Sequence, residues 1–436
     1  MNSPTVLEAR VVRLSLHGRL VGYLTGFTNG QNVVTFDRAF REDPVRPTFS
    51  LTTHPEFPRA GTLLSRPWTT RQRVHPVLSN LLPEGALRDF IAQGLKVHRD
   101  NEFAFLAYLG RDLPGAIVAE PAEPKDLPAT LLDTLGQAKS VRIVGTSNEK
   151  KFSLAGVQMK FSMKEHDGRY NLATGDELGD WIIKTPSTTH RCVPENEYTA
   201  MMLAELVGVD MPDIRLVELD KLDNLPAINL PAEKLAFAIR RFDRKEGQRV
   251  HMEDFAQVLM KYPHEKYDSA NYEQLARILY RFSGQALTDV QQFARRLLVN
   301  ILLANGDAHL KNWSLLYRDR MTPTLSPAYD IVTTRAYIDG ETQFALNLGK
   351  TKSWDDITLN HFERWAAKAD LPWRAIQPQL ADVMDKARSL WPKALNDLPM
   401  DEAQKDILRR HWHGLHNDFR ISRDRPLPLN HHRSSL

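Results

Sequence analysis

The spacing of apolar residues changes near residue 251, and this change constrains the fold more than any other feature of the sequence. Before it, short apolar runs punctuated by Gly and Pro are typical of β-strands, with one helix expected from about Glu195 to Val207. After it, apolar residues recur at every third or fourth position, which indicates helices. We therefore predict a β-rich lobe at residues 146–250 and a helical lobe at residues 251–436.

A second strand-rich region opens the chain. Three short apolar runs between residues 10 and 36, separated by Gly and Asn, predict a small antiparallel sheet, and helical signals begin near Val74. The run at 119–130 is rich in Pro and polar residues and indicates a connector that continues neither helix nor strand. We expect an N-terminal α+β module at residues 1–120 and a linker at residues 121–145, so the fold class as a whole is α+β.

Composition and charge exclude several classes of protein. The chain has 436 residues, 42% of them hydrophobic and 25% charged, as in an ordinary globular protein. No apolar run approaches the roughly 20 residues that span a bilayer, and we expect no signal peptide. The net charge of +3 is interspersed with acids, unlike the basic stripe of a nucleic-acid-binding protein. A single cysteine fits a reducing compartment, so we expect a cytoplasmic protein without membrane contact.

The strongest chemical signal is a loop that follows a buried helix. It reads Asn305-Gly-Asp-Ala-His-Leu-Lys-Asn312 and precedes an expected strand. An Asp with an Asn five residues later is the spacing of the protein-kinase catalytic loop. There the Asp accepts a hydrogen bond from the attacking hydroxyl, and the Asn carboxamide oxygen ligates magnesium. We predict Asp307 as the catalytic residue and Asn312 as a magnesium ligand.

Three further residues stand in the order that kinase chemistry requires. Asp330 lies between apolar residues after the loop and can supply the charged oxygen that magnesium prefers. Lys184 ends the apolar strand Trp181-Ile-Ile-Lys184, where a lysine can pair with the α- and β-phosphates of ATP. Glu197, in the helix that follows, is a candidate partner for that lysine, with Glu195 and Glu205 as alternatives.

The joint order of these residues favours a phosphotransferase with a two-lobed, protein-kinase-like fold. Each residue alone is a weak signal, because an Asp in a loop is more often a helix cap or a turn residue. No Gly-rich or Walker A loop precedes Lys184. The run Phe152-Ser-Leu-Ala-Gly-Val-Gln-Met-Lys160 is a candidate replacement, because small residues let backbone amides approach phosphates; the alternative is an ordinary strand with a bend.

Taken together, the motifs resemble the HipA family, serine/threonine kinase toxins of bacterial type II toxin-antitoxin systems. The resemblance extends from about residue 10 to residue 415. It rests on these segments: Asn80-Leu-Leu-Pro-Glu-Gly85, Gly110-Arg-Asp-Leu-Pro-Gly-Ala116, Ser153-Leu-Ala-Gly-Val-Gln-Met-Lys160, Trp181-Ile-Ile-Lys184, Asn196-Glu-Tyr198, Arg241-Phe-Asp-Arg244, Asn305-Gly-Asp-Ala-His-Leu-Lys-Asn312 and Tyr329-Asp-Ile331.

The resemblance implies a role for each matching residue. It implies ATP and Mg²⁺ as cofactors, with Asp307 as the catalytic Asp. It also implies a protein substrate, a class that includes aminoacyl-tRNA synthetases in relatives, and a small helix-turn-helix antitoxin (HipB-like) through which the chain associates indirectly with operator DNA. The residues implied to contact the nucleotide are Ser153, Ala155, Gly156, Val157, Lys160, Lys184, Phe242, His309 and Lys311.

The same resemblance implies self-inactivation by autophosphorylation of Ser153. A phosphoserine there would place nearly two negative charges where the ATP phosphates bind. Ser147 and Ser162 are alternative acceptors close in sequence. One departure concerns the hinge, where relatives often have an acidic residue and this chain has Arg240.

Two other functions remain open from the sequence. The loop at 305–312 also resembles that of aminoglycoside and choline phosphotransferases, so the acceptor could be a small molecule. The chain could also be a catalytically silent subunit of a repressor complex, although all the expected catalytic residues are present. The segment around Ser153 and the N-terminal module favour the toxin kinase.

Overall fold

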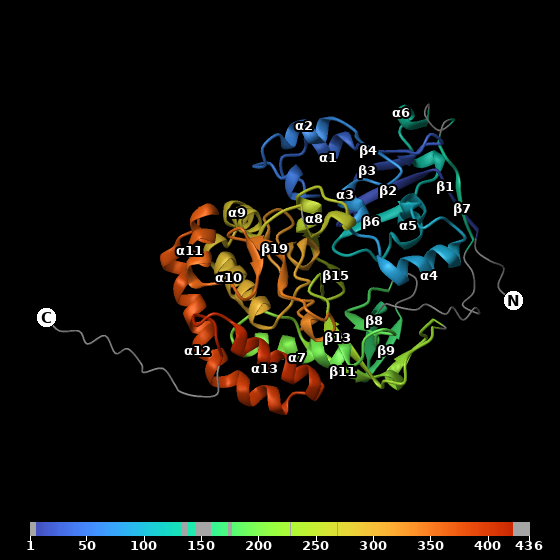
Figure 1. Ribbon diagram of the computed structural model, residues 1–436. Helices are drawn as coiled ribbons and strands as arrows, with labels where there is room; N and C mark the ends of the chain where they lie inside the picture. Colours follow the sequence, from blue (N-terminus) through green and yellow to red (C-terminus); the bar gives the residue numbers. More distant parts are fainter. Residues whose placement is uncertain are drawn as a thin grey trace.

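The structure is a computed structural model, in which an antiparallel sheet of five strands forms the first layer of the protein (Figure 1). The structure describes residues 6–132, 136, 138–144, 158–172, 177–226, 228–267 and 269–421. The three expected strands are present as β2 (Val11–Leu16), β3 (Arg19–Gly26) and β4 (Gln31–Phe36). β5 (Trp68–Arg71) and β6 (Ile117–Pro121) complete the sheet in the order β5-β4-β3-β2-β6.

Short helices connect and cover this sheet. The longest is α4 (Gly85–Leu95), and α5 (Glu102–Leu109) places Phe103 and Phe105 in the core with Leu14 and Leu24 of the sheet. Burial of such side chains stabilises a fold by about 2–3 kcal/mol each. The remaining helical elements are α1 (Arg38–Glu42), η1 (Leu51–Thr53), α2 (Ala60–Ser65) and α3 (Pro76–Ser79).

The segment after β6 is more regular than a connector without helix or strand. It contains the short helices η2 (Pro124–Asp126) and α6 (Ala129–Leu132). It ends in β7 (Val141–Val144), which pairs antiparallel with β1 (Val6–Ala9) at the start of the described chain. The expectation that 119–130 continues neither helix nor strand is therefore wrong, because Ala and Leu follow its prolines and are sufficient for a single helical turn.

A six-stranded sheet follows, in the order β11-β13-β10-β8-β9-β12. Helix α7 (Val193–Leu206) covers one of its faces: Phe237 and Ile239 of the sheet share a core with Met201 and Leu203 of the helix. Ala86, Leu87 and Phe90 of α4 pack on the opposite face. The strands are β8 (Lys160–His166), β9 (Arg169–Leu172), β10 (Trp181–Lys184), β11 (Ile214–Glu218), β12 (Leu222–Asp223) and β13 (Leu235–Arg240).

Helices dominate the chain after residue 254, although short strands lie among them. The helices are α8 (Phe255–Val258), α9 (Tyr272–Phe282), α10 (Ala286–Leu302), α11 (Leu359–Lys368), α12 (Trp373–Asp397) and α13 (Glu402–Gly414). Three short strands precede these helices: β14 (Arg244–Lys245), β15 (Gln248–Arg249) and β16 (His251–Asp254). The strands among the helices are β17 (Ser314–Tyr317), β18 (Thr324–Leu325), β19 (Gln343–Leu348) and β20 (Thr351–Ser353). The predicted α+β fold, strand-rich first and helical later, is confirmed.

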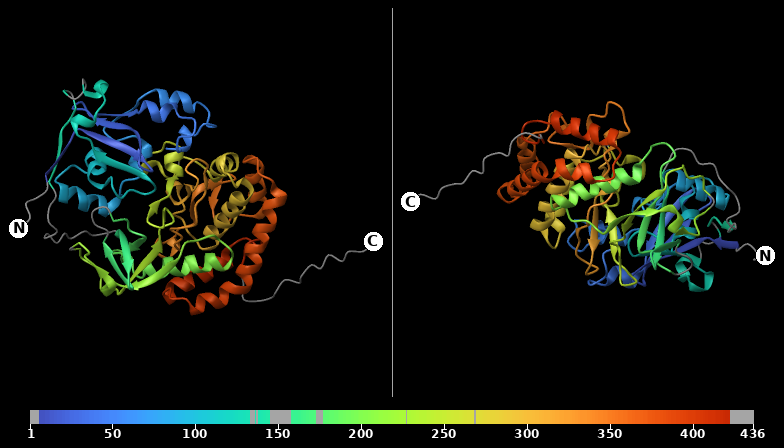
Figure 2. Two further views of the ribbon diagram at one scale, coloured as in Figure 1. Left: turned by 180° about the vertical axis from the view of Figure 1, so that it is seen from behind. Right: turned by 90° about the horizontal axis from the view of Figure 1, so that it is seen from below.

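The N-terminal layer contacts both later parts of the chain. Figure 2 shows its blue and cyan elements beside the green sheet and the yellow helices. Polar contacts fix this arrangement: the backbone of Leu51 and the hydroxyl of Ser50 donate to the buried Glu253 carboxylate at 2.6 and 2.9 Å, and the Gln257 amide donates to the carbonyl of Val77 at 2.7 Å. In the described part of the chain, no helix is long and apolar enough to cross a membrane.

Candidate functional site

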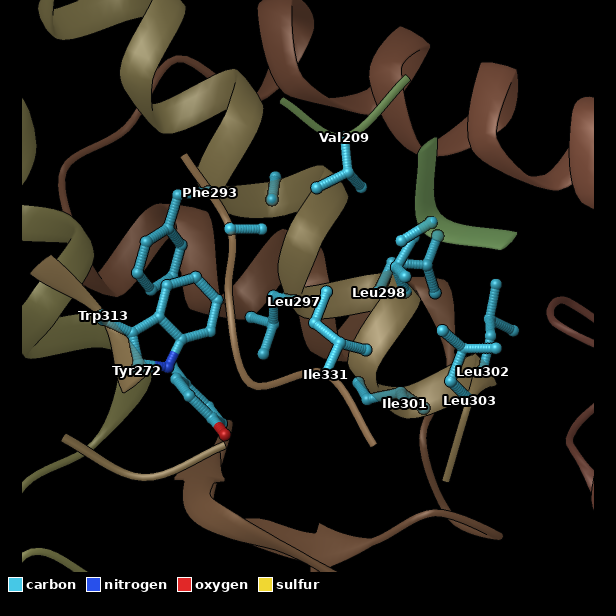
Figure 3. Close-up of a cluster of buried hydrophobic side chains, with 14 of the residues drawn as sticks. Val209, Tyr272, Phe293, Leu297, Leu298, Ile301, Leu302, Leu303, Trp313 and Ile331 are labelled. Atoms are coloured by element: carbon cyan, nitrogen blue, oxygen red, sulfur yellow. The ribbon is translucent and has the colours of Figure 1, made fainter. Parts of the chain in front are cut away.

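The loop that carries Asp307 begins where α10 ends. Ala304 adopts a left-handed conformation (φ 52°), which turns the chain out of the helix. Below the loop lies a buried apolar cluster, in which Leu302 and Leu303 precede the loop and Trp313 follows it (Figure 3). The indole of Trp313 and the hydroxyl of Tyr272 both donate to the carbonyl of Ala308, at 3.2 and 2.9 Å. Side chains of the core therefore fix the backbone of the loop.

Asp307 and Asn312 lie together in this loop. The Asn312 side-chain amide donates to the Asp307 carbonyl at 2.9 Å, which leaves the Asn312 carboxamide oxygen to accept other partners. The Asp307 side chain is half exposed, and its Oδ1 accepts a hydrogen bond of 2.6 Å from the hydroxyl of Tyr267. The loop therefore presents one accessible carboxylate and one amide oxygen.

Asn305 joins this loop to Asp330. Its Oδ1 accepts from the backbone amide of Asp307 at 3.0 Å, and its Nδ2 donates to the carbonyl of Asp330 at 3.3 Å. Gly306 fits here because a Cβ would lie 2.1 Å from Oε1 of Glu341. A single buried amide thus fixes the backbones of two predicted site residues relative to each other.

Asp330 adopts a left-handed backbone conformation (φ 54°), which is unusual for a residue other than Gly. Two anchors that follow it in the chain sustain it: Ile331 is buried in the cluster of Figure 3, and Thr333 donates its backbone amide to Oδ1 of Asn196 at 2.9 Å. Strained backbone of this kind persists where the surrounding structure holds it, often at functional sites.

Lys184 forms the centre of a charged cluster. Its Nζ contacts Oε1 of Glu197 at 2.5 Å and also pairs directly with Oδ1 of Asp330. Lys160 Nζ lies 3.5 Å from the other Asp330 oxygen. Glu197 is therefore the lysine partner, whereas Glu205 is exposed and Glu195 makes no contact with Lys184 among those the structure describes. Lys184 and Glu197 are buried, so their pairing is shielded from solvent.

Strand alternation explains how Lys184 reaches this cluster. Successive side chains of a strand point to opposite faces of the sheet. Trp181 and Ile183 of β10 belong to the core beneath α4, so Ile182 and Lys184 face the α7 side. Glu197 lies on α7, one turn from its start at Val193. The packing of α7 against the sheet therefore brings the two side chains together.

The electrostatics of the cluster favour its charged form. Burial alone would raise the pKa of Asp330, but Lys160 and Lys184 outweigh it and hold that pKa well below its usual range. Burial would lower the pKa of Lys184, but Asp330 and Glu197 raise it above its usual value. Burial of Glu197 raises its pKa in spite of Lys184. Asp330 is thus an ionised carboxylate that holds cationic groups.

The side chains present fit a magnesium ion and a nucleotide phosphate. Magnesium prefers hard oxygen donors, and the Asp330 carboxylate and the Asn312 carboxamide supply them. In the described structure the Asp330 carboxylate already holds two ammonium groups, those of Lys184 and Lys160. The second oxygen of Glu197 and Nδ1 of His309 are buried without a hydrogen-bond partner among the described residues. The cluster therefore has unused polar atoms that a bound group can engage.

The other predicted nucleotide contacts differ in where the structure places them. His309 is buried beside the loop, and burial lowers its pKa to about 4, so the imidazole is neutral. The ring of Phe242 lies 5.5 Å from that of Tyr329, the residue before Asp330, as expected for a residue near the site. The predicted contacts Ser153, Ala155, Gly156 and Val157, together with the alternative acceptor Ser147, lie outside the described residues.

Lys311 differs from the prediction of a nucleotide contact. Its Nζ contacts Oε1 of Glu84 at 2.5 Å and donates to the carbonyl of Asn80 at 3.0 Å. Glu84 also pairs with Lys266 at 3.1 Å, and although burial opposes it, these two lysines lower the pKa of Glu84 to about 2. The Lys311 ammonium is therefore used to join the loop to the N-terminal layer, a contact between distant segments that no local pattern indicated.

The segment Arg241-Phe-Asp-Arg244 forms a second charged cluster. Asp243 accepts bonds of 2.8 Å from Arg241 Nη2, Arg244 Nη1 and the backbone amide of Gly115. Asp112 pairs with both arginines, at 3.3 and 3.1 Å. Burial opposes ionisation of Asp243, but its arginine partners dominate and its pKa is held well below its usual range. These contacts join the six-stranded sheet to residues 112–115.

Two residues left open by the sequence lie around this second cluster. Ser162 accepts a bond of 2.8 Å from Arg241 Nη1, so its hydroxyl is tied to the cluster and is a poor alternative to Ser153 as phosphate acceptor. Arg240 is exposed, and its Nη1 lies 3.8 Å from Asp213. Arg240 is thus an exposed residue at the presumed hinge, and its guanidinium lies 6.0 Å from the centroid of the Trp181 ring.

Two family models match successive stretches of the chain. The model described as the HipA-like C-terminal domain matches residues 152–391, and the HipA N-terminal domain matches residues 12–120. The protein Y4dM of Sinorhizobium fredii, which is provisionally named a kinase, is 39% identical over 94% of this chain and 97% of its own length. The serine/threonine-protein kinase toxin HipA of Shewanella oneidensis is 26% identical over 66% of this chain and 70% of its own length.

A solved structure supports the fold. A chain from the complex of HipA, HipB and operator DNA of Shewanella oneidensis superposes with a TM-score of 0.68 at 20% identity. The match covers 92% of this chain and 94% of that chain, so the arrangement of the elements described above is shared along nearly the full length.

Proposed function

Because this chain belongs to the HipA family, we propose that it is an ATP-dependent protein serine/threonine kinase that acts as the toxin of a toxin-antitoxin pair. The observation that carries the proposal is the link through Asn305, which holds the Asp307 loop against Asp330 beside the Lys184–Glu197 pair. The names of the relatives in Sinorhizobium fredii and Shewanella oneidensis support kinase chemistry.

In this proposal Asp307 receives the acceptor. Its half-exposed carboxylate accepts the hydroxyl proton of a serine or threonine as the oxygen of that hydroxyl attacks the γ-phosphorus and the bond to the β-phosphate oxygen breaks. Positioning and electrostatic stabilisation supply most of the catalysis in reactions of this type. The fixed backbone of the loop, held at Ala308 by Tyr272 and Trp313, suits that role.

Lys184 binds phosphate in the same proposal. Glu197 keeps its ammonium in place, and Asp330 releases its direct contact with Lys184 when the nucleotide enters. Asp330 and Asn312 are the residues that would hold Mg²⁺, which when bound neutralises charge on the phosphate oxygens. His309, which is neutral and buried, and Phe242 lie beside the nucleotide in this proposal.

We also propose that Ser153 is the site of self-inactivation. Lys160 is the described residue nearest to it in sequence that belongs to the cluster, because its Nζ lies 3.5 Å from Asp330. A phosphate on Ser153 would compete with the nucleotide phosphates for this lysine and for Lys184. The tie between Ser162 and Arg241 favours Ser153 over Ser162.

The partner in this proposal is a small HipB-like helix-turn-helix antitoxin, through which the chain associates with operator DNA. The support is the composition of the Shewanella oneidensis complex, whose HipA chain shares the fold. A near-neutral net charge of +3 agrees with DNA contacts made by a partner. The protein substrate, with aminoacyl-tRNA synthetases as the first class to test, remains a prediction.

Phosphopeptide mapping after incubation with ATP and Mg²⁺ tests the proposed function. We expect phosphate on Ser153 in the wild-type chain and none in Asp307→Ala, whose circular dichroism and melting temperature should match the wild type. Because the Asp307 side chain is half exposed in a loop, its truncation should not unfold the protein.

Three results would overturn the proposal. Retained phosphate transfer in Asp307→Ala would show that Asp307 is not the catalytic residue. A wild-type chain that binds no ATP and acquires no phosphate would favour the catalytically silent subunit. Phosphorylation of an aminoglycoside or choline, with no phosphate on proteins, would replace the protein acceptor by a small molecule.

A further inference from the structure

Tyr267 lies beside Asp307 and comes from a segment that no sequence motif marked. Its hydroxyl donates to Oδ1 of Asp307 at 2.6 Å, and its ring meets the His309 ring edge to face with centroids 5.1 Å apart. The Tyr267 residue is 39% exposed, so its hydroxyl lies at the surface from which an acceptor must approach. Burial and the Asp307 charge raise the pKa of this hydroxyl, which keeps it protonated and able to donate.

The backbone next to Tyr267 is held firmly. The carbonyl of Lys266 accepts from the backbone amide of Leu310, inside the Asp307 loop, at 3.2 Å. The ammonium of Lys266 pairs with Glu84 of the N-terminal layer at 3.1 Å. On the other side, the Ser269 hydroxyl donates to the carbonyl of Glu265 at 2.7 Å. Tyr267 is thus presented from a fixed turn rather than from a free loop.

The Asp307 carboxylate depends on this contact. Its backbone is fixed by Asn305 and Asn312, but its side chain is half exposed. Within the residues that the structure describes, the Tyr267 hydroxyl is the one hydrogen-bond donor that reaches the carboxylate, since His309 Nε2 stands 3.9 Å away. Without the hydroxyl, the carboxylate would be free to rotate about its terminal side-chain bond.

We propose that Tyr267 is a positioning residue for phosphate transfer: its hydroxyl holds Oδ1 of Asp307 so that Oδ2 faces the acceptor hydroxyl. This inference rests on the proposed function, because it assigns Asp307 the task of receiving the acceptor proton. Small errors in the placement of a reacting group cost large factors in rate, about 100-fold for 1 Å. The Tyr267 ring packs against His309, one of the predicted nucleotide contacts, but its hydroxyl reaches Asp307 and not Lys184 or Asp330. Loss of the hydroxyl alone should therefore leave ATP binding nearly unchanged.

An opposite role for the same contact is physically possible. A hydroxyl that donates to Asp307 occupies a position that an acceptor hydroxyl could take, and Tyr267 would then block the site. The fixed turn favours positioning, because a blocking residue has to leave when the acceptor binds, and Lys266 is tied on both its carbonyl and its ammonium. The two roles predict changes of opposite sign.

The test is Tyr267→Phe, which removes one oxygen atom and keeps the ring. We expect the rate of γ-phosphate transfer from Mg²⁺-ATP to the chain itself at saturating ATP to fall by about 10- to 100-fold. The dissociation constant for ATP should stay within about 2-fold and the melting temperature should not change. If Tyr267 had a purely structural role, the variant would have a lower folded fraction, and the transfer rate, the ATP affinity and the melting temperature would all fall together.

Tyr23→Phe is the matched control. The Tyr23 hydroxyl donates to the carbonyl of Asp126 at 3.2 Å in the N-terminal layer, so its loss removes a hydrogen bond of the same kind away from the site. Its transfer rate should equal that of the wild type. An unchanged rate in Tyr267→Phe would overturn the inference alone, and a faster rate would replace positioning by blocking. A wild-type chain that transfers no phosphate would overturn the proposed function and this inference with it.

Discussion

The two charged clusters of the molecule contain similar groups but differ in how fully their most buried carboxylates are satisfied. Around Asp243, two arginines, the Asp112 carboxylate and the Gly115 amide engage one another in a largely buried network. Around Lys184, one oxygen of Glu197 is buried without a partner, and the Asp330 side chain remains 23% exposed. Both clusters come from segments that the sequence singled out as motifs.

This difference separates a structural connection from a candidate site. Both oxygens of the buried Asp243 carboxylate accept hydrogen bonds, so this carboxylate has no acceptor left for a ligand, and breaking such a buried network is costly. A cluster with an accessible carboxylate and an orphaned polar atom can exchange partners when a cation or phosphate arrives. The Asp243 cluster therefore holds the N-terminal layer on the sheet, and the Lys184 cluster is the one suited to chemistry.

Asp330→Asn should give the largest effect on activity. The substitution keeps the size of the side chain and removes the charge that Mg²⁺ and Lys184 both require, so phosphate transfer should fall on the order of 1,000-fold. The free energy of unfolding should change by less than about 1.5 kcal/mol, because Lys184 retains Glu197. Transfer rates and urea unfolding measure the two effects. Near wild-type transfer would show that Asp330 holds no essential cation.

Asp243→Asn should give the largest effect on stability. Two buried arginines would lose their common charged partner and keep Asp112, which is one-third exposed, as the carboxylate that pairs with both, so the free energy of unfolding should fall by about 3 kcal/mol. Transfer per folded molecule should be retained. Asp223→Asn is the control, because the exposed Asp223–Arg169 pair should contribute nothing measurable. A loss of phosphate transfer in folded Asp243→Asn would show that the Asp243 cluster also belongs to the active site.

Glu253 provides a pH-dependent test of the contact between the N-terminal layer and the later part of the chain. Burial raises its pKa to about 7, against hydrogen bonds from Tyr317, Leu51 and Ser50. In the unfolded chain the carboxyl ionises near 4.5, so between these values the folded state binds more protons and stability falls as pH rises. This contribution is complete below pH 4.5 and lost above pH 7.

Glu253→Gln isolates that contribution because it cannot ionise. The stability of the wild type relative to the variant should fall by on the order of 2–3 kcal/mol between pH 4.5 and 7, and the difference should be flat outside this window. Urea unfolding at a series of pH values measures it. A wild type that gains stability relative to the variant over this range would reverse the sign and contradict the burial argument.

The sequence predicted the positions of those candidate site residues whose place on a strand or loop follows from the pattern of neighbouring residues. Lys184 ends an apolar strand, and Asp307 and Asn312 share one loop, so their spacing alone placed them correctly relative to helix and strand. Contacts between distant segments had no such signal. The family resemblance implied a nucleotide contact for Lys311, whose ammonium pairs with Glu84 in this structure, and Tyr267 belongs to no motif. Such contacts join segments that are far apart in the sequence, so the spacing of residues within one segment does not predict them.

The most direct test of the account compares Mg²⁺-dependent ATP binding, by calorimetry, in Asp330→Asn and Asp243→Asn at a temperature where both are folded. The account predicts that Asp243→Asn binds within about 3-fold of the wild type, whereas Asp330→Asn loses the dependence on Mg²⁺ and at least about 100-fold in affinity. Retained Mg²⁺-dependent binding in Asp330→Asn, with binding lost in folded Asp243→Asn, would contradict it and exchange the roles of the two clusters.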